Sequence, residues 1–111
     1  MMALFPFFGR RRTEAVLAEL AAHISAGALE AVWRRVYSRL STLSPTEARG
    51  YIRARARLVI HRQVTQTLSQ QPQLMAWHAR LVDLANEATI ETVLRQWRKL
   101  QPQSTAARRA A

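Results

Sequence analysis

Three histidines are the side chains of this sequence that could hold a metal ion, because imidazole nitrogens are common metal ligands. They are His23, His61 and His78, and they fall in three separate segments of helical period. The spacings that place two ligands on one helix face, H-E-x-x-H or paired E-x-x-H, are absent, and only Glu19 stands four residues before His23. We therefore expect surface or boundary histidines, with no metal site and no cofactor.

Catalytic motifs are also missing. The chain has no cysteine, its seven carboxylates are scattered singly, and three glycines are too few for a phosphate-binding loop. A general acid and base would have to be brought together by the tertiary fold. We predict a protein that is not an enzyme and takes no small-molecule substrate.

The charge of the chain points to anionic partners. Seventeen Lys and Arg against seven Asp and Glu give a net charge of +10, which favours nucleic acid or acidic lipid headgroups. A composition rich in Ala and Arg can also make a small protein basic without any anionic ligand. The charge is therefore either functional or incidental.

Arginines repeat with helical spacing on the segment after Pro45. Arg49, Arg53 and Arg57 are four residues apart and form a stripe that we expect to be solvated. Arginines of the preceding segment would extend this surface. The predicted nucleic-acid contacts are Arg34, Arg35, Arg39, Arg49, Arg53 and Arg57.

Two further arginines fall within the apolar arc of the same segment. Arg55 and Arg62 cannot lose their protons, so a buried position would require a carboxylate, carbonyl groups or a wet subunit interface. We predict buried or interface charges, with Arg55 paired to a carboxylate of a flanking helix. The candidate carboxylates are Glu30, Asp83, Glu87 and Glu91.

Aromatic side chains could stack on bases, but most lie on or beside apolar helical faces, which favours core packing. They are Trp33, Tyr37, Tyr51, Trp77 and Trp97. Trp97 is the exception, because it lies among Arg95, Arg98 and Lys99 and could face phosphates or headgroups.

The first twelve residues form an apolar stretch followed by three arginines. The stretch is too short to span a membrane, and its charge does not precede the apolar run as in a secretory signal, so cytoplasm is expected. Pro6 predicts an extended arm that either covers the bundle or rests in a membrane interface. The contact residues of this arm would be Phe5, Phe7, Phe8, Arg10, Arg11 and Arg12.

The clearest helix signal begins at Ser44. Ser44 is a good N-cap, Pro45 suits the first helical position, and Glu47 completes a capping box, so a helix is predicted over 45–69. Its expected core face is formed by Ala48, Tyr51, Ile52, Ala56, Leu58 and Val59. Later apolar residues, Ile60, Val64 and Leu68, shift toward the arginine stripe.

The rest of the chain predicts further helices. Residues 13–43 carry two nearly opposite apolar faces, which indicates a break at 25–27. Pro72 opens a helix whose apolar face shifts near 86–89, so this helix either breaks there or is continuous with its two ends against different partners. We expect an all-α fold, a small bundle of four to five helical segments around the long central helix. The expected organisation is an arm over 1–12, a single helical domain over 13–100 and a disordered basic tail over 101–111.

The segment LSTLSPTEARGYI, residues 40–52, resembles the opening of helix-turn-helix domains of the response-regulator type. In that family a glycine turn and a recognition helix follow. Here the helical period continues through Val64 instead, so the family's function is not carried over.

Together these features predict a non-enzymatic, basic helical binding module that engages nucleic acid through an arginine-rich helical face. One alternative is a self-associating helical scaffold, such as a homodimer, in which the charge is incidental. The other is a peripheral membrane protein held by the Phe/Arg arm.

Overall fold

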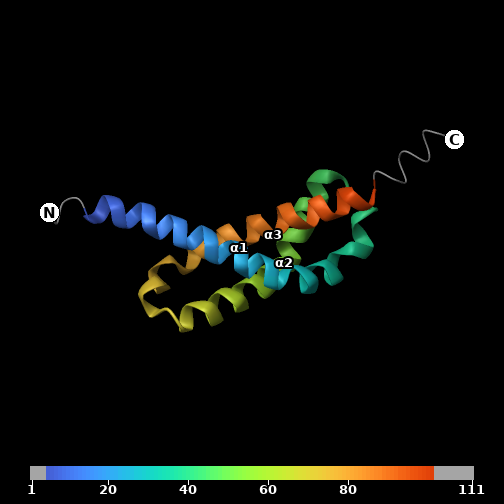
Figure 1. Cartoon of the computed structure of the whole chain (residues 1–111). Coiled ribbons are helices and arrows are strands. Elements are labelled where there is room, and N and C mark those ends of the chain that lie inside the picture. The colour runs from blue at the N-terminus through green and yellow to red at the C-terminus, as the bar shows by residue number, and fades with distance from the viewer. Residues whose placement is uncertain (1–4, 102–111) are drawn as a thin grey trace.

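The computed structural model describes residues 5–101, and over these residues it consists of three long helices and one short one (Figure 1). The helices are α1 (Phe5–Leu40), α2 (Pro45–Ser69), the 3-10 helix η1 (Pro72–Trp77) and α3 (His78–Leu100). The predicted all-α fold is confirmed. The number of segments is smaller than the four to five expected, because the predicted break at 25–27 does not occur and α3 continues past 86–89.

Helix α1 is continuous through Gly27, so the predicted break at 25–27 is wrong. Gly27 has an ordinary negative φ. The two opposite apolar faces are the ends of one winding seam, because residues spaced by four advance about 40° around a straight helix at each step. The seam of α1 contains Leu17, Ala21, Ile24, Ser25, Ala28, Val32, Val36 and Leu40, all buried.

This continuity reverses the expected effect of a substitution at Gly27. A methyl group added there would meet no atom within 4 Å, and Gly27 is exposed in mid-helix. We expect Gly27→Ala to raise the free energy of unfolding by up to about 1 kcal/mol, since Ala has the higher helix propensity. A urea melt measures this change, and a loss of stability would show that the helix is interrupted there after all.

The start of α2 matches the prediction from sequence. The Oγ of Ser44 accepts a hydrogen bond from the backbone N–H of Glu47 at 3.2 Å, and a carboxylate oxygen of Glu47 accepts one from the N–H of Ser44 at 2.9 Å. This reciprocal capping box satisfies two backbone donors that the helix itself leaves unpaired. It fixes where α2 begins, immediately after the short α1–α2 connection.

The capping box makes the stability of the fold depend on pH. Hydrogen bonds from the backbone and side chain of Ser44 lower the pKa of Glu47 below its usual value. Glu47 therefore contributes stability at pH values above its unfolded pKa, and this contribution is lost as the pH falls through the lower folded pKa. Urea melts from pH 6 down to pH 2 should show the native chain more stable than Glu47→Gln at pH 6 and the two converging in acid. A constant difference would assign the effect to packing.

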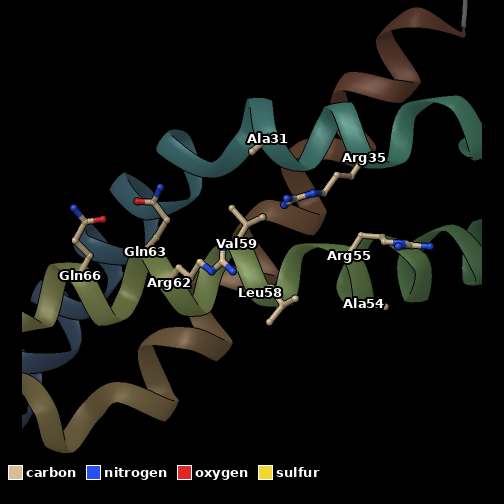
Figure 2. Close-up of a pocket in the computed structure, with 9 residues that line it drawn as sticks. All are labelled: Ala31, Arg35, Ala54, Arg55, Leu58, Val59, Arg62, Gln63 and Gln66. Atoms are coloured by element: carbon tan, nitrogen blue, oxygen red, sulfur yellow. The ribbon is translucent and has the colours of Figure 1, made fainter.

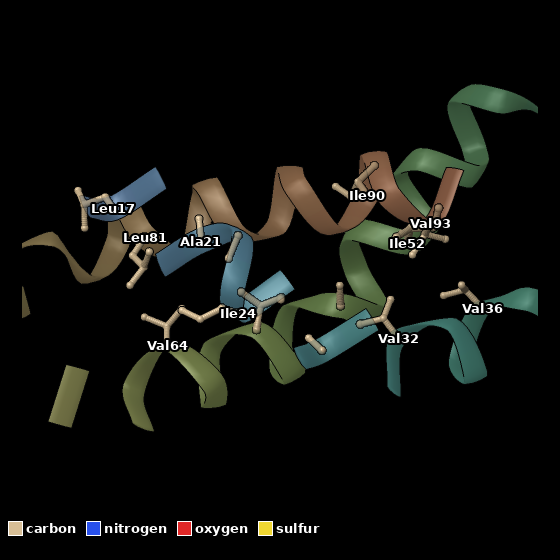
Figure 3. Packing of buried hydrophobic residues seen from close by; sticks show 14 of the residues in the cluster. Leu17, Ala21, Ile24, Val32, Val36, Ile52, Val64, Leu81, Ile90 and Val93 are labelled. Atoms are coloured by element: carbon tan, nitrogen blue, oxygen red, sulfur yellow. The ribbon is translucent and has the colours of Figure 1, made fainter. Parts of the chain in front are cut away.

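Four-residue steps also define the buried seams of the other two helices. In α2 the buried residues are Ala48, Ile52, Ala56, Ile60, Val64 and Leu68; in α3 they are Leu81, Ala85, Asn86, Thr89, Ile90 and Val93. Rows of residues four apart are the ridges that pack between helices in the commonest class of helix contact. Figure 3 shows side chains of all three helices meeting in this one core.

The observed seam of α2 is rotated from the predicted core face. Ile60, Val64 and Leu68 belong to the core, whereas Leu58 is 69% exposed. Arg55 is also exposed, beside the seam and not within it. The predicted burial of Arg55 and Arg62 within the bundle is therefore wrong, because the period of four, not the arc of densest apolar residues, sets the face. Their alternative placement at a subunit interface stays a prediction.

Helix α3 runs without interruption past 86–89, which settles the alternative of a break there. Before it, Pro72 begins a helical turn as expected, but the turn is of the 3-10 type. At the other end of the chain, α1 already begins at Phe5, so Pro6 lies in its first turn and the predicted extended conformation is wrong. The expected contacts of Phe5, Phe7, Phe8 and Arg10, and the tail beyond residue 101, lie outside what the structure describes.

Candidate anion-binding site

Two arginines of the predicted stripe are paired with carboxylates of α3. Arg49 Nη1 lies 2.7 Å from Glu91 Oε1, and Arg53 Nη2 lies 2.6 Å from Glu87 Oε1. Because α2 and α3 are antiparallel, a step of four forward on α2 meets a step of four backward on α3. The ion pairs of Arg49 and Arg53 therefore link α2 to α3, and they compensate most of the positive charge of the stripe.

The next arginine of the stripe, Arg57, forms no such ion pair with α3. Arg57 and Asp83 line the same cavity of about 360 Å³ between α2 and α3, but no ion pair joins them. Asp is shorter than Glu by one methylene group, which leaves its carboxylate farther from the arginine. Asn86 lines this cavity as well, and its Oδ1 is buried without a hydrogen-bond partner.

The arginines of α1 differ from one another in the same way. Arg34 donates a hydrogen bond to Glu30, one turn earlier on the same helix, at 2.6 Å. Within the described part of the chain, Arg35 and Arg39 make no ion pair. Both are exposed, so their charges are available to solvent or to a ligand.

A groove between α1 and α2 gathers arginines that no carboxylate compensates. Its volume is about 520 Å³, and we call it the α1–α2 groove. It is lined by Ala31 and Arg35 from α1 and by Ala54, Arg55, Leu58, Val59, Arg62, Gln63 and Gln66 from α2. Figure 2 shows Arg35 and Arg62 reaching toward Val59 from opposite helices, while Arg55 lies along α2. Among residues 5–101, none of these three arginines is ion-paired.

Tyr51 organises the end of this groove near Arg55. The guanidinium carbon of Arg55 lies 5.3 Å from the centre of the Tyr51 ring, within the range of a cation–π contact. The hydroxyl of Tyr51 donates a hydrogen bond to the backbone carbonyl of Arg35 at 3.3 Å. One aromatic side chain thus joins α1 to α2 and supports an arginine on its face.

None of the carboxylates that the sequence offered to Arg55 pairs with it. Glu87 and Glu91 bind Arg53 and Arg49, Glu30 binds Arg34, and Asp83 faces the opposite cavity. The predicted buried bridge of Arg55 is therefore wrong. The signal that could have located the groove was present, since the four-residue series from Ala48 to Leu68 places Arg55 and Arg62 beside the seam and not within it.

The three histidines are surface or boundary residues, as expected: His23 and His61 are exposed and His78 is half-buried. The rings of His61 and His78 meet edge to face with centres 5.0 Å apart, and Thr65 Oγ1 lies 3.1 Å from His78 Nε2. The turn through η1 brings the end of α2 beside the start of α3. Within residues 5–101, no group of three or more possible protein ligands is arranged to hold a metal ion.

Trp97, which the sequence singled out as a possible contact for phosphates or headgroups, packs against the core at the other end of the bundle. It is half-buried and lines a cavity with Leu40 at the end of α1 and Leu43 in the α1–α2 connection. Trp33 and Tyr37 stack with ring centres 6.2 Å apart, and Tyr37 is 52% exposed. This stacked pair is an exposed aromatic feature on α1.

Helix α1 is long and apolar enough, over 11–40, to cross a membrane by length and composition, and no other described helix is. The same helix supplies core residues such as Leu17, Ile24 and Val32, which are fully buried against α2 and α3. A core helix of a helical bundle satisfies the same criterion.

No family model matches the chain, and the searches found no curated protein and no solved structure similar to it.

Proposed function

We propose that this protein is a non-enzymatic nucleic-acid-binding module that contacts the sugar–phosphate backbone through the α1–α2 groove. The observation that supports this function is the lining of the groove, which includes Arg35, Arg55 and Arg62 but no carboxylate. Guanidinium groups offer several donors in a planar fork that suits phosphate oxygens.

Compensation of charge elsewhere supports the choice of this face. Arg34, Arg49, Arg53 and Arg80 all have carboxylate partners. The excess charge of the +10 chain is thus carried by other basic residues, among them the three in the groove, with Arg39 and Arg57 adding to the long-range attraction. The predicted contact surface on the Arg49, Arg53 and Arg57 stripe accordingly moves to the opposite side of α2.

Two variants with the same net charge test this proposal. In the groove variant, Arg35, Arg55 and Arg62 are changed to Gln; in the control, Arg34, Arg49 and Arg53 are changed to Gln. Fluorescence anisotropy with a labelled oligonucleotide over a salt series should show more than about tenfold weaker binding for the groove variant and a salt slope reduced by about 3. The control should keep most of the affinity, with a circular dichroism melt confirming that both variants are folded.

Equal losses in the two variants would mean that only net charge matters and that the groove is not a defined site. Unchanged binding by the groove variant would remove the groove from the interface. Absence of any binding by the native chain at low salt would overturn the nucleic-acid function itself.

Self-association is the second candidate, because the exposed Trp33–Tyr37 stack on α1 offers an aromatic anchor of the kind enriched at protein interfaces. Sedimentation of the native chain and of Tyr37→Ser measures it. The alternative of a peripheral membrane protein held by the Phe/Arg arm stays a prediction, and liposome flotation before and after deletion of residues 1–12 checks it.

A further inference from the structure

We infer that the α1–α2 groove takes single-stranded rather than double-stranded nucleic acid, with one base stacked on the guanidinium plane of Arg55. This inference rests on the proposed function and adds the class of ligand. It is carried by the Tyr51–Arg55 contact and by the apolar side chains that line the groove, neither of which a phosphate-only site requires.

The Tyr51–Arg55 pair is a pre-organised stacking platform. The hydrogen bond from the Tyr51 hydroxyl to the Arg35 carbonyl holds the ring against α1, and the ring in turn supports the guanidinium of Arg55. Arg55 is exposed, so its guanidinium group is accessible to a ligand while it contacts the ring. Guanidinium planes and aromatic rings are the surfaces on which proteins stack unpaired bases.

Apolar side chains line the groove beside the arginines. Val59 is half-buried and points toward α1 (Figure 2), and Leu58, 69% exposed, is the most exposed large apolar side chain among residues 11–101. Ala31 and Ala54 line the groove as well. A duplex hides the faces of its bases in the stack, whereas a single strand offers them to such side chains, so this lining favours the single strand.

Charged and amide groups lie farther along the groove from Arg55. Arg35 and Arg62 project over Val59 from the two helices (Figure 2), where they can hold phosphates on either side of a strand. Gln63 and Gln66 line the same groove and present both donors and acceptors to base edges or sugars. The groove thus offers a binding group for each part of a nucleotide.

Four probes distinguish the kinds of ligand that the groove could bind. They are a labelled single-stranded oligo-dT, a duplex of equal length, inorganic polyphosphate, which has charge but no base, and poly-glutamate, which represents an acidic protein partner. The native chain should bind oligo-dT several-fold more tightly than the other three at equal salt.

Two lysine substitutions separate stacking from charge in the native fold. Arg55→Lys keeps the charge but removes the planar face, so its affinity for oligo-dT should fall at least about fivefold while polyphosphate binding stays the same. The matched control, Arg57→Lys, keeps the charge of an exposed arginine outside the groove, on the α3-facing side of the same helix, and should change oligo-dT binding less than about twofold. Both sites are exposed, and thermal melts check that both variants fold.

Equal affinity for oligo-dT and the duplex or polyphosphate, or no effect of Arg55→Lys, would overturn the stacked base while leaving the proposed anion-binding groove intact. Tightest binding to poly-glutamate would overturn both in favour of an acidic protein partner. A native chain that binds none of the four probes would refute the proposed function itself.

Discussion

Replacing Ile60 by Ala is expected to destabilise the bundle by about 2–5 kcal/mol, the largest effect of any single truncation proposed for this chain. Ile60 is fully buried near the middle of the α2 seam, between Ala56 and Val64. Truncation of this side chain to Ala leaves an unfilled space beside neighbouring core atoms. The seams of the bundle already contain several small residues. A urea melt followed by circular dichroism at 222 nm measures the change in the free energy of unfolding.

Leu58 provides the matched control for this experiment. It lies two residues away on the same helix and is also aliphatic, but it is 69% exposed. We expect Leu58→Ala to change stability by no more than about 0.5 kcal/mol. If Leu58→Ala were the more damaging substitution, the face first predicted from the sequence would be the true core face.

Local sequence signals predicted the boundaries of α2 well. Ser44, Pro45 and Glu47 act through the backbone within a single turn, so their effect does not depend on the rest of the fold. The same reasoning located the loop before Pro72. Features that are decided within four residues of chain are therefore readable without the tertiary structure.

The core faces of α1 and α2 could not be predicted from such local signals. A wheel at 100° per residue averages over a straight helix, and it therefore divided the winding seam of α1 into two opposed faces and suggested a break at 25–27. In α2 it favoured Leu58 over Ile60 for the same reason. Following the steps of four through each helix gives the observed core, because neighbouring helices pack along those ridges.

The candidate site depended on pairings that link distant parts of the sequence. Arg49 and Glu91 are 42 residues apart, and Arg53 and Glu87 are 34 apart, so nothing local indicated that these charges would compensate each other. The pairing leaves Arg55 and Arg62 as charged residues on the opposite side of α2. Because the core face of α2 is rotated from the predicted one, these two arginines are exposed and available to a ligand.

The ion pairs with α3 and the α1–α2 groove both follow from the orientation of α2. Its α3-facing side carries arginines at steps of four that meet carboxylates, and its α1-facing side carries arginines beside Gln63 and Gln66. Charge on the first side contributes to holding the helices in place, although half-exposed pairs of this kind contribute only about 0–1 kcal/mol each. The second side is then free to bind an anion without competing with the fold.

The second large effect on stability is expected from a substitution at the contact between α1 and α3. Ser25 is buried on α1 and is hydrogen bonded to Thr89 of α3 at 3.1 Å. The Thr89 hydroxyl also donates to the Ala85 carbonyl at 2.7 Å. Because that hydroxyl has a single proton, Ser25 supplies the proton of the bond between the two side chains. Small residues at this point, Ala21 and Ala85 among them, are buried and let the helices approach closely.

We therefore expect Ser25→Leu to destabilise the fold by about 2–4 kcal/mol, since it overfills this contact and removes a buried hydrogen bond. The neighbouring substitution Ala26→Leu is the control, because Ala26 is exposed on the same helix and Leu is a good helix former. It should change stability by no more than about 0.5 kcal/mol. Urea melts of the two variants compare a core position with a surface position one residue apart. Equal stability would mean that α1 does not pack on α3 through Ser25, and a greater loss in Ala26→Leu would place Ala26 in an interface between copies of the chain.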